Sequence, residues 1–495
     1  MGDSMKRMAS ILIVACCLVT LAGRIAPAQG PGGDKSTAVS AVQRLNRAPV
    51  NKEVLRVNLP RPRETKLANG LTVLVLEQHK LPTVAFVLWV KTGALADPKN
   101  MPGLAKATAE MLREGTSHRS SAALAADVDN LGATLAASAG FGSGISTVRA
   151  SGLSASTDRL LELMGDVVLN PTFPADEFAK YQKRQLAQVE QERSDPGFLA
   201  EERFHKVLYG DFAASIISPT PESIKGMTTA ELRDFHHRYY VPNNAILGVV
   251  GDVRFDQIIP QIKEFLGGWE GHTLVATDSG KVPPPAPSKV ILVDRPGSVQ
   301  TNIIAGDFAL RRADPDYAIL TVMNRVLGGG PSARLFLNLR EEHGYTYGAY
   351  SYFTSDLYPG AWMATTEVRN AVTDGSMHEL MAEFKRIRTE RVPDSELDDA
   401  RRSIIAGFAL SLEQPAGLLS LWMTANYFHL PEDYWDRYPD EIAKVSPEAV
   451  EQAARKYVDL DRLQFVCVGD AKEIKGVLKK YGPVEVYDAE GKRVE

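Results

Sequence analysis

The sequence predicts an α+β protein made of two duplicated domains, each an antiparallel sheet covered by helices. One observation is a repeated strand, Gly-Asp turn and helix, seen in "NNAILGVVGDVRFDQIIPQIKEFLGGW" and again in "LQFVCVGDAKEIKGVLKKYG". The turns, Gly251-Asp252 and Gly469-Asp470, lie 218 positions apart. The other is a pair of helix starts at Pro174 and Pro393, which lie 219 positions apart. Two anchors at nearly the same offset indicate an internal duplication.

A proline-rich stretch separates the two repeats. "GKVPPPAPSKV" holds four prolines within the five positions 283–287. Such a composition favours extended polyproline geometry and makes a semi-rigid spacer. We therefore expect a first domain over residues 51–279, a linker over 280–289 and a second domain over 290–495.

The N-terminus is typical of an exported protein. Lys6-Arg7 precedes an apolar run from Ala9 to Gly23, and a small-residue site follows at Ala26-Pro27-Ala28. This pattern predicts a signal peptide over 1–28 and export, with the periplasm as the expected compartment. An alternative is lipidation at Cys16 after "IVA". Residues 29–50 are rich in Gly, Ser, Ala and Pro and are predicted to be a flexible leader.

Composition excludes several classes of protein. The 495 residues are 44% hydrophobic and 24% charged, which is ordinary for a globular protein. The formal charge of −5 gives no basic footprint for nucleic acid. After the signal peptide, no segment approaches 18 uninterrupted apolar residues, so no membrane span is expected in the mature chain. Cys467 is the one cysteine beyond the signal peptide, and it cannot form an internal disulfide.

The first elements are read from local patterns. "GLTVLVLEQ" and "TVAFVLWVKTG" predict two early strands, the first one after a turn at Ala68-Asn69-Gly70. "MPGLAKATAEMLREGT", residues 101–116, predicts a helix that starts after Pro102-Gly103 and stops at Gly115. Lys106 and Glu110 are four residues apart on this helix and can pair. The plain interpretation of this polar stripe is a solvated helix face.

Two motifs carry a resemblance to a known family. "GALADPKNMPGLAKATAEMLREGT" and "VLGGGPSARLFLNLREEHGYTYGAYSYF" resemble the pitrilysin/insulinase metallopeptidases, the inverzincins, and the resemblance runs from about residue 56 to 480. It implies two α+β domains per chain, paired into a clam around a peptide-binding chamber.

Active members of that family carry His-x-x-Glu-His on this helix and a distal glutamate. Two histidines one helical turn apart bind one zinc, and the glutamate between them activates the metal-bound water. Aligned on Gly115-Thr116, the three motif positions hold Lys106, Ala109 and Glu110 here. The distal position falls on Gln188, with Glu190 and Glu192 as rivals if the register slips. We therefore expect a degenerate motif and no metal in this chain.

The histidines offer no replacement motif. None of the nine forms a pair three or four residues apart, and His378-Glu379 begins a false motif that has Ala382 in place of the second histidine. A metal site assembled from distant residues is the remaining alternative for a self-sufficient peptidase.

The second motif of the family is retained. The resemblance implies that Arg340 and Tyr347 assist substrate binding and stabilise the transition state, as donors to a developing oxyanion. It also implies that the loop at Gly328, Gly329 and Gly330 contacts peptide. The structural alternatives are that Arg340 pairs with Glu341 or Glu342, that Tyr347 packs in a sheet, and that the glycines form a helix C-cap and turn.

These features predict a non-catalytic subunit of an exported heterodimeric zinc metallopeptidase. A homologous partner chain would carry the zinc, and both chains would act on a peptide substrate. One alternative is a peptide-binding or scaffold module without an enzymatic role, which would bind peptides by β-addition. The other is a self-sufficient peptidase with an unrecognised metal site.

Overall fold

The computed structural model describes residues 57–275 and 277–495. The predicted signal peptide 1–28, Cys16 and the leader 29–50 lie outside the described residues.

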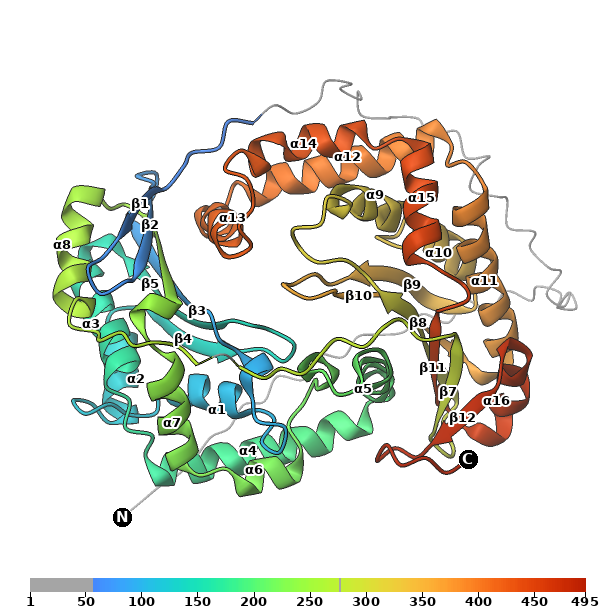
Figure 1. Cartoon of the computed structure of the whole chain (residues 1–495), viewed down its shortest axis with the longest axis horizontal. Coiled ribbons are helices and arrows are strands. Elements are labelled where there is room, and N and C mark those ends of the chain that lie inside the picture. Colours follow the sequence, from blue (N-terminus) through green and yellow to red (C-terminus); the bar gives the residue numbers. More distant parts are fainter. Residues whose placement is uncertain (1–56, 276) are drawn as a thin grey trace, which may run out of the picture. The chain divides into compact units, whose positions relative to one another are not determined.

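The first half of the chain forms a six-stranded sheet (Figure 1). Its strands are β1 (Arg63–Lys66), β2 (Thr72–Glu77), β3 (Thr83–Val90), β4 (Thr134–Ala139), β5 (Ser146–Leu153) and β6 (Ala245–Gly251). They are ordered β1-β2-β6-β3-β5-β4. Gly70 precedes β2 with φ +97°, a conformation that suits glycine and confirms the predicted turn.

The second half forms a sheet of the same design. Its strands are β7 (Lys289–Asp294), β8 (Gln300–Phe308), β9 (Thr346–Phe353), β10 (Ala361–Arg369), β11 (Gln464–Gly469) and β12 (Val484–Tyr487). They are ordered β12-β7-β11-β8-β10-β9.

The pairing pattern of the two sheets confirms the predicted duplication. β2 pairs in parallel with β6, and β7 pairs in parallel with β11. From there the antiparallel pairs β6-β3-β5-β4 match the pairs β11-β8-β10-β9. The sheets are thus mixed rather than fully antiparallel, because a strand that returns after a long helical connection can join beside its first strand in parallel.

Helices surround both sheets. The first half contributes α1 (Leu104–Met111), α2 (Ser121–Asn130), α3 (Thr157–Leu169), α4 (Ala175–Ser194), α5 (Pro196–Tyr209), α6 (Pro221–Gly226), α7 (Thr229–Tyr239) and α8 (Phe255–Leu266). The second half contributes α9 (Tyr317–Leu327), α10 (Arg334–Phe336), α11 (Thr373–Thr389), α12 (Asp394–Ser411), α13 (Pro415–Tyr427), α14 (Tyr434–Lys444), α15 (Pro447–Tyr457) and α16 (Ala471–Leu478). Pro174 and Pro393 are the N-caps of α4 and α12, as their spacing predicted.

One helix from each half packs on the sheet of the other half. α5 contacts β11, β8 and β7 of the second sheet, while α13 contacts β6 of the first sheet (Figure 1). Both helices start with a proline, Pro196 and Pro415, at the duplication offset of 219. Leu199, Phe204 and Leu208 of α5 belong to the apolar cluster on one face of the second sheet. The opposite faces of the two sheets are covered by helices from their own halves.

A glycine permits the close approach of α5. A Cβ on Gly306 of β8 would lie 2.7 Å from Cζ of Phe204 and would also meet the carbonyl oxygen of Trp362. Gly248 of β6 has the same relation to α13, because a Cβ there would lie 2.6 Å from Sδ of Met423. We call α5 and α13 the exchanged helices, because each packs on the sheet of the other half. Each of them contacts a glycine of that sheet.

Two further findings concern apolar segments. Cys467 is fully buried in β11, and burial raises the pKa of its thiol to about 12. Among the described helices, no single one is long and apolar enough to cross a membrane; α12 and α13 pass that test only as a pair, with a 108° bend between them.

We expect Gly306→Ala to destabilise the protein by about 1–3 kcal/mol, because the added methyl would overlap both the carbonyl oxygen of Trp362 on β10 and the Phe204 ring of α5. Chemical denaturation of the full chain would measure this change. Gly476→Ala in α16 is the matched control, since a Cβ there meets no atom within 4 Å and replaces a helical glycine. An equal effect of the two substitutions would contradict the proposed contact.

Candidate functional site

The helix that carries the degenerate motif is short and mostly buried. α1 begins after Gly103, which has φ +93°, and Asp97 accepts hydrogen bonds from the backbone N–H groups of Gly103 and Ala105 at 2.7 and 2.8 Å. The predicted helix over 101–116 ends early, at Met111, because the following residues turn away toward α2. Ala109 is fully buried in the core of the first half.

Lys106 and Glu110 form an ion pair that α4 partly covers. Nζ of Lys106 lies 2.6 Å from Oε1 of Glu110 and 3.2 Å from Oε1 of Gln185 on α4. The two charged side chains are 21% and 33% exposed. The ring of Tyr181, also on α4, lies 5.9 Å from the ammonium group. The stripe is therefore only in part the solvated helix face that the sequence predicted, because α4 covers some of it.

The residue of α4 that faces the degenerate motif is Gln185. Its side chain is buried and contacts Lys106. Gln188, predicted from the sequence for this place, is exposed and instead donates to Oε1 of Glu192 at 2.9 Å. The count from Pro174 along this helix reached Gln188 rather than Gln185, because a count along the sequence does not tell which side chains of α4 face α1.

The side chains at this face do not fit a zinc ion. The ammonium of Lys106 donates hydrogen bonds and offers no lone pair to a metal. It also fills the space between Glu110 and Gln185 that an ion would need. Over residues 57–275 and 277–495, no group of three His, Cys, Asp or Glu side chains is placed to hold a metal.

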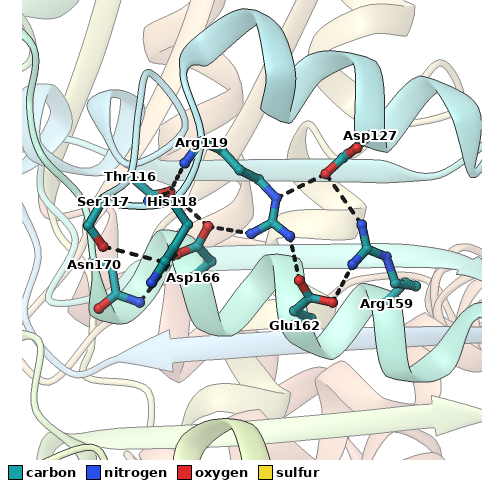
Figure 2. Close-up of polar contacts among 9 residues, drawn as sticks. All are labelled: Thr116, Ser117, His118, Arg119, Asp127, Arg159, Glu162, Asp166 and Asn170. Carbon is teal, nitrogen blue, oxygen red and sulfur yellow. Dashed lines mark hydrogen bonds and ion pairs between the residues drawn. The ribbon is translucent and has the colours of Figure 1, made fainter.

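A charged network anchors the segment that follows α1 (Figure 2). The guanidinium of Arg119 contacts Asp127 of α2 at 2.9 Å, Asp166 of α3 at 2.7 Å, and Glu162 of α3. Arg159 pairs with Asp127 and Glu162 from the other side. One half-buried arginine, Arg119, thus ties the end of the α1 segment to two helices.

Asp166 is the most buried member of this network, with a side chain 4% exposed. Oδ1 lies 2.7 Å from Nδ1 of His118, and Oδ2 accepts from the hydroxyl of Thr116 at 2.7 Å. Burial by itself raises the pKa of Asp166, but hydrogen bonds from His118, Thr116, Arg119 and other donors outweigh it and hold the pKa below its ordinary value.

The neighbouring Ser117, His118 and Asp166 do not form a nucleophilic triad. The hydroxyl of Ser117 lies 3.4 Å from Nδ1 of His118, the same ring nitrogen that contacts Asp166. A triad needs the serine on one ring nitrogen and the carboxylate on the other. The cluster in Figure 2 is therefore structural.

Arg340 and Tyr347 lie together at the edge of the second sheet. Arg340 sits in a π-helical turn over Leu337–Glu342, and β9, which carries Tyr347, is the edge strand. Gly344, with φ +63°, joins the turn to the strand. Cζ of Arg340 lies 5.9 Å from the centre of the Tyr347 ring.

The structure shows neither the ion pair of Arg340 nor the packing of Tyr347 that the structural alternatives predicted. Tyr347 is 91% exposed and does not pack in the sheet. Arg340 makes no ion pair with Glu341, Glu342 or any other carboxylate in the part of the chain that the structure describes. Both polar groups are therefore available to a ligand.

The three glycines have a steric role in the fold. The carbonyl of Gly328 accepts from the backbone N–H of Ser351 at 2.9 Å, and a Cβ on Gly328 would lie 2.5 Å from the Ser351 hydroxyl. A Cβ on Gly329 would lie 2.8 Å from Cα of Arg325, and one on Gly330 would lie 2.8 Å from its Nη1. The loop is thus held against β9 and α9, and its contact with peptide stays a prediction.

A groove lies between the α4–α5 junction and the strands β8, β9 and β10. Its volume is about 510 Å³. Four carboxylates line it, together with aromatic and small side chains: Glu192, Asp195, Glu201 and Glu367, with Tyr350, Tyr352, Gly197 and Gly348. Its wall is shared by both halves, because α5 packs on the second sheet.

Comparison with known proteins identifies the family. Residues 72–220 match the family model described as insulinase, peptidase family M16, and residues 226–404 match the model described as peptidase M16 inactive domain. The chain belongs to the M16 peptidase family. Within this M16 chain, the motif positions of the first half hold Lys106, Ala109 and Glu110.

Named relatives agree with this assignment. A protein of Bacillus subtilis called an uncharacterized zinc protease is 24% identical over 358 residues, which is 71% of this chain and 85% of that protein. A solved peptidase M16 inactive domain from Pseudomonas fluorescens has a TM-score of 0.76 and 29% identity, covering 84% of this chain and 98% of that one. A protease from Helicobacter pylori, with a TM-score of 0.77 and 20% identity, covers 83% of this M16 chain and 100% of its own, and shares the fold.

We expect Asp166→Asn to lower the free energy of unfolding at pH 7 by roughly 1–3 kcal/mol, because hydrogen bonds to a buried charge are lost. The native carboxyl has a pKa below that of the unfolded chain, so its contribution is present above about pH 4 and disappears as the pH falls further. Urea unfolding at several pH values would show the gap between variant and wild type closing in acid.

Asp211→Asn is the control for this variant, because its side chain is 95% exposed. It should change stability little at any pH. A loss for Asp166→Asn that stays the same down to pH 3 would contradict an ionised carboxylate at the centre of the network.

Proposed function

We propose that this chain is the non-catalytic subunit of an exported, heterodimeric zinc metallopeptidase. The exposed pair Arg340 and Tyr347 carries the proposal, because these side chains are positioned together and have no structural partner in the described residues. Lys106 and Glu110 in place of metal ligands support a partner chain that carries the zinc. The N-terminal sequence supports export to the periplasm.

The chemistry proposed for this chain is the recognition of a peptide and the stabilisation of charge. Hydrolysis of a peptide bond builds negative charge on the carbonyl oxygen. The hydroxyl of Tyr347 is free to donate a hydrogen bond to that oxygen. The guanidinium of Arg340 can hold a neighbouring carbonyl or carboxylate through two parallel N–H groups.

The groove beside β9 supports a peptide as the ligand. Its volume of about 510 Å³ is large enough for several residues of a peptide, and both carboxylates and tyrosine rings line it. The edge strand β9 is partly closed, since the backbone N–H of Ser351 is already bonded to Gly328 and its carbonyl to Asn324. The backbone groups of Ser351 are therefore not available for β-addition of a peptide.

A second candidate is a peptide-binding module without an enzymatic role. One observation favours it: the groove brings together the α4–α5 junction of the first half and strands of the second sheet, which gives the chain a peptide-sized surface of its own. The two candidates differ in what accompanies the chain in the cell.

A native pull-down of the mature chain, with mass spectrometry of the copurifying proteins, tests the pairing. We expect a stoichiometric homologue that bears His-x-x-Glu-His. Recovery of the chain alone, as a monomer or a self-dimer, would contradict the heterodimer and favour the binding module.

In the assembled complex, we expect Tyr347→Phe to lower kcat roughly 10²–10³-fold, the usual cost of losing one donor to an oxyanion. Steady-state kinetics on a peptide, with the assembly checked by size-exclusion chromatography, would measure this. Tyr345→Phe, two residues earlier and packed against the core of the second half, is the control and should leave kcat unchanged. An unchanged kcat for Tyr347→Phe would contradict the role of Tyr347 as a donor to the oxyanion.

A further inference from the structure

The face formed by α1 and α4 suggests how this chain lost its metal. The ammonium of Lys106 is held by two oxygens, one from Glu110 on its own helix and one from Gln185 on the facing helix. We infer that Lys106, Glu110 and Gln185 occupy the three ligand positions of the former metal site, and that the Lys106 ammonium is its permanent internal cation. This inference concerns the isolated chain and does not depend on the proposed pairing.

The geometry of the three positions is that of a three-ligand site. Residues 106 and 110 are one helical turn apart, so their side chains lie on the same side of α1. Gln185 reaches the same point from α4, and its side chain is only 7% exposed. Glutamine differs from glutamate in one terminal atom, so position 185 keeps the length and direction of a carboxylate ligand.

The charges of the side chains explain why Lys106, Glu110 and Gln185 occur together in place of the family's zinc ligands. A lysine at 106 needs one negative partner in this shielded place, and Glu110 supplies it at 2.6 Å. A second carboxylate at 185 would leave an excess negative charge beside the buried Tyr181, and the neutral amide avoids it. Lys106, Glu110 and Gln185 thus form a neutral set that closes the site to cations.

The neighbouring candidate Gln188 lacks these properties. It is exposed and bonds along its own helix to Glu192. Residues 185 and 188 are three apart on α4, so their side chains leave the helix in different directions and at different positions along its axis. This difference provides a matched pair of variants.

The test is to rebuild the site and measure metal binding on the full mature chain. The first variant carries Lys106→His, Glu110→His and Gln185→Glu. The second carries the same two histidines with Gln188→Glu. Calorimetric titration with Zn²⁺ gives the stoichiometry and affinity, and the visible spectrum with Co²⁺ reports the coordination geometry.

We expect the Gln185→Glu triple variant to bind one Zn²⁺ and the wild type to bind none stoichiometrically. The Gln188→Glu triple variant should bind at least roughly tenfold more weakly, since even an outer partner of a ligand is typically worth 10- to 100-fold in metal affinity. Equal binding by the two variants would overturn the assignment of Gln185. Folded variants that both fail to bind would overturn the inference as a whole.

If the triple variants do not fold, a second measurement tests the role of Lys106. Lys106→Met, Glu110→Gln and the double variant form a thermodynamic cycle read by thermal unfolding. If Lys106 is the internal cation, Lys106→Met lowers Tm by roughly 1–2 °C in a chain of this size, and adding Glu110→Gln restores part of the loss. Independent effects of the two substitutions would contradict that role.

Discussion

The exchange of helices between the two halves is the constraint on which this structure depends. α5 leaves the first half and covers a face of the second sheet, and α13 does the reverse. Leu419, Trp422 and Met423 of α13 are buried against strands of the first sheet. Each fully buried side chain of this size contributes about 1.5–3 kcal/mol. The exchanged faces are therefore main cores of the protein, and the groove beside β9 exists because α5 is one of its walls.

The two site elements differ in how firmly the surrounding structure holds them. The Arg340–Tyr347 pair sits on an edge strand and a π-helical turn, where its polar groups face outward and contribute little to packing. The former metal helix is buried and fixed at both ends, by Asp97 at its start and by the Arg119 network after its end. Its ligands could change only to residues that keep the charge balanced inside this frame, and Lys106 with Glu110 meets that condition.

Much of the fold could be predicted from the sequence because the repeated pattern was local. The strand, turn and helix around Gly251 and Gly469 and the proline helix starts are short motifs with direct physical signals. The exchange of α5 and α13 left no such signal, because a buried helix looks the same whichever sheet it covers. The same limit applied to the site. Arg340 and Tyr347 were found through a motif, whereas Gln185 was missed because its role depends on a contact between α1 and α4 that no spacing in the sequence encodes.

The glycine beneath each exchanged helix marks the surface through which each half covers the sheet of the other half. A single half with its own helix extended would leave one face of its sheet bare, and such a face does not persist in water. Two identical halves would cover one another reciprocally, as subunits related by a twofold axis do. The present chain thus has, within one polypeptide, the reciprocal arrangement of a domain-swapped homodimer.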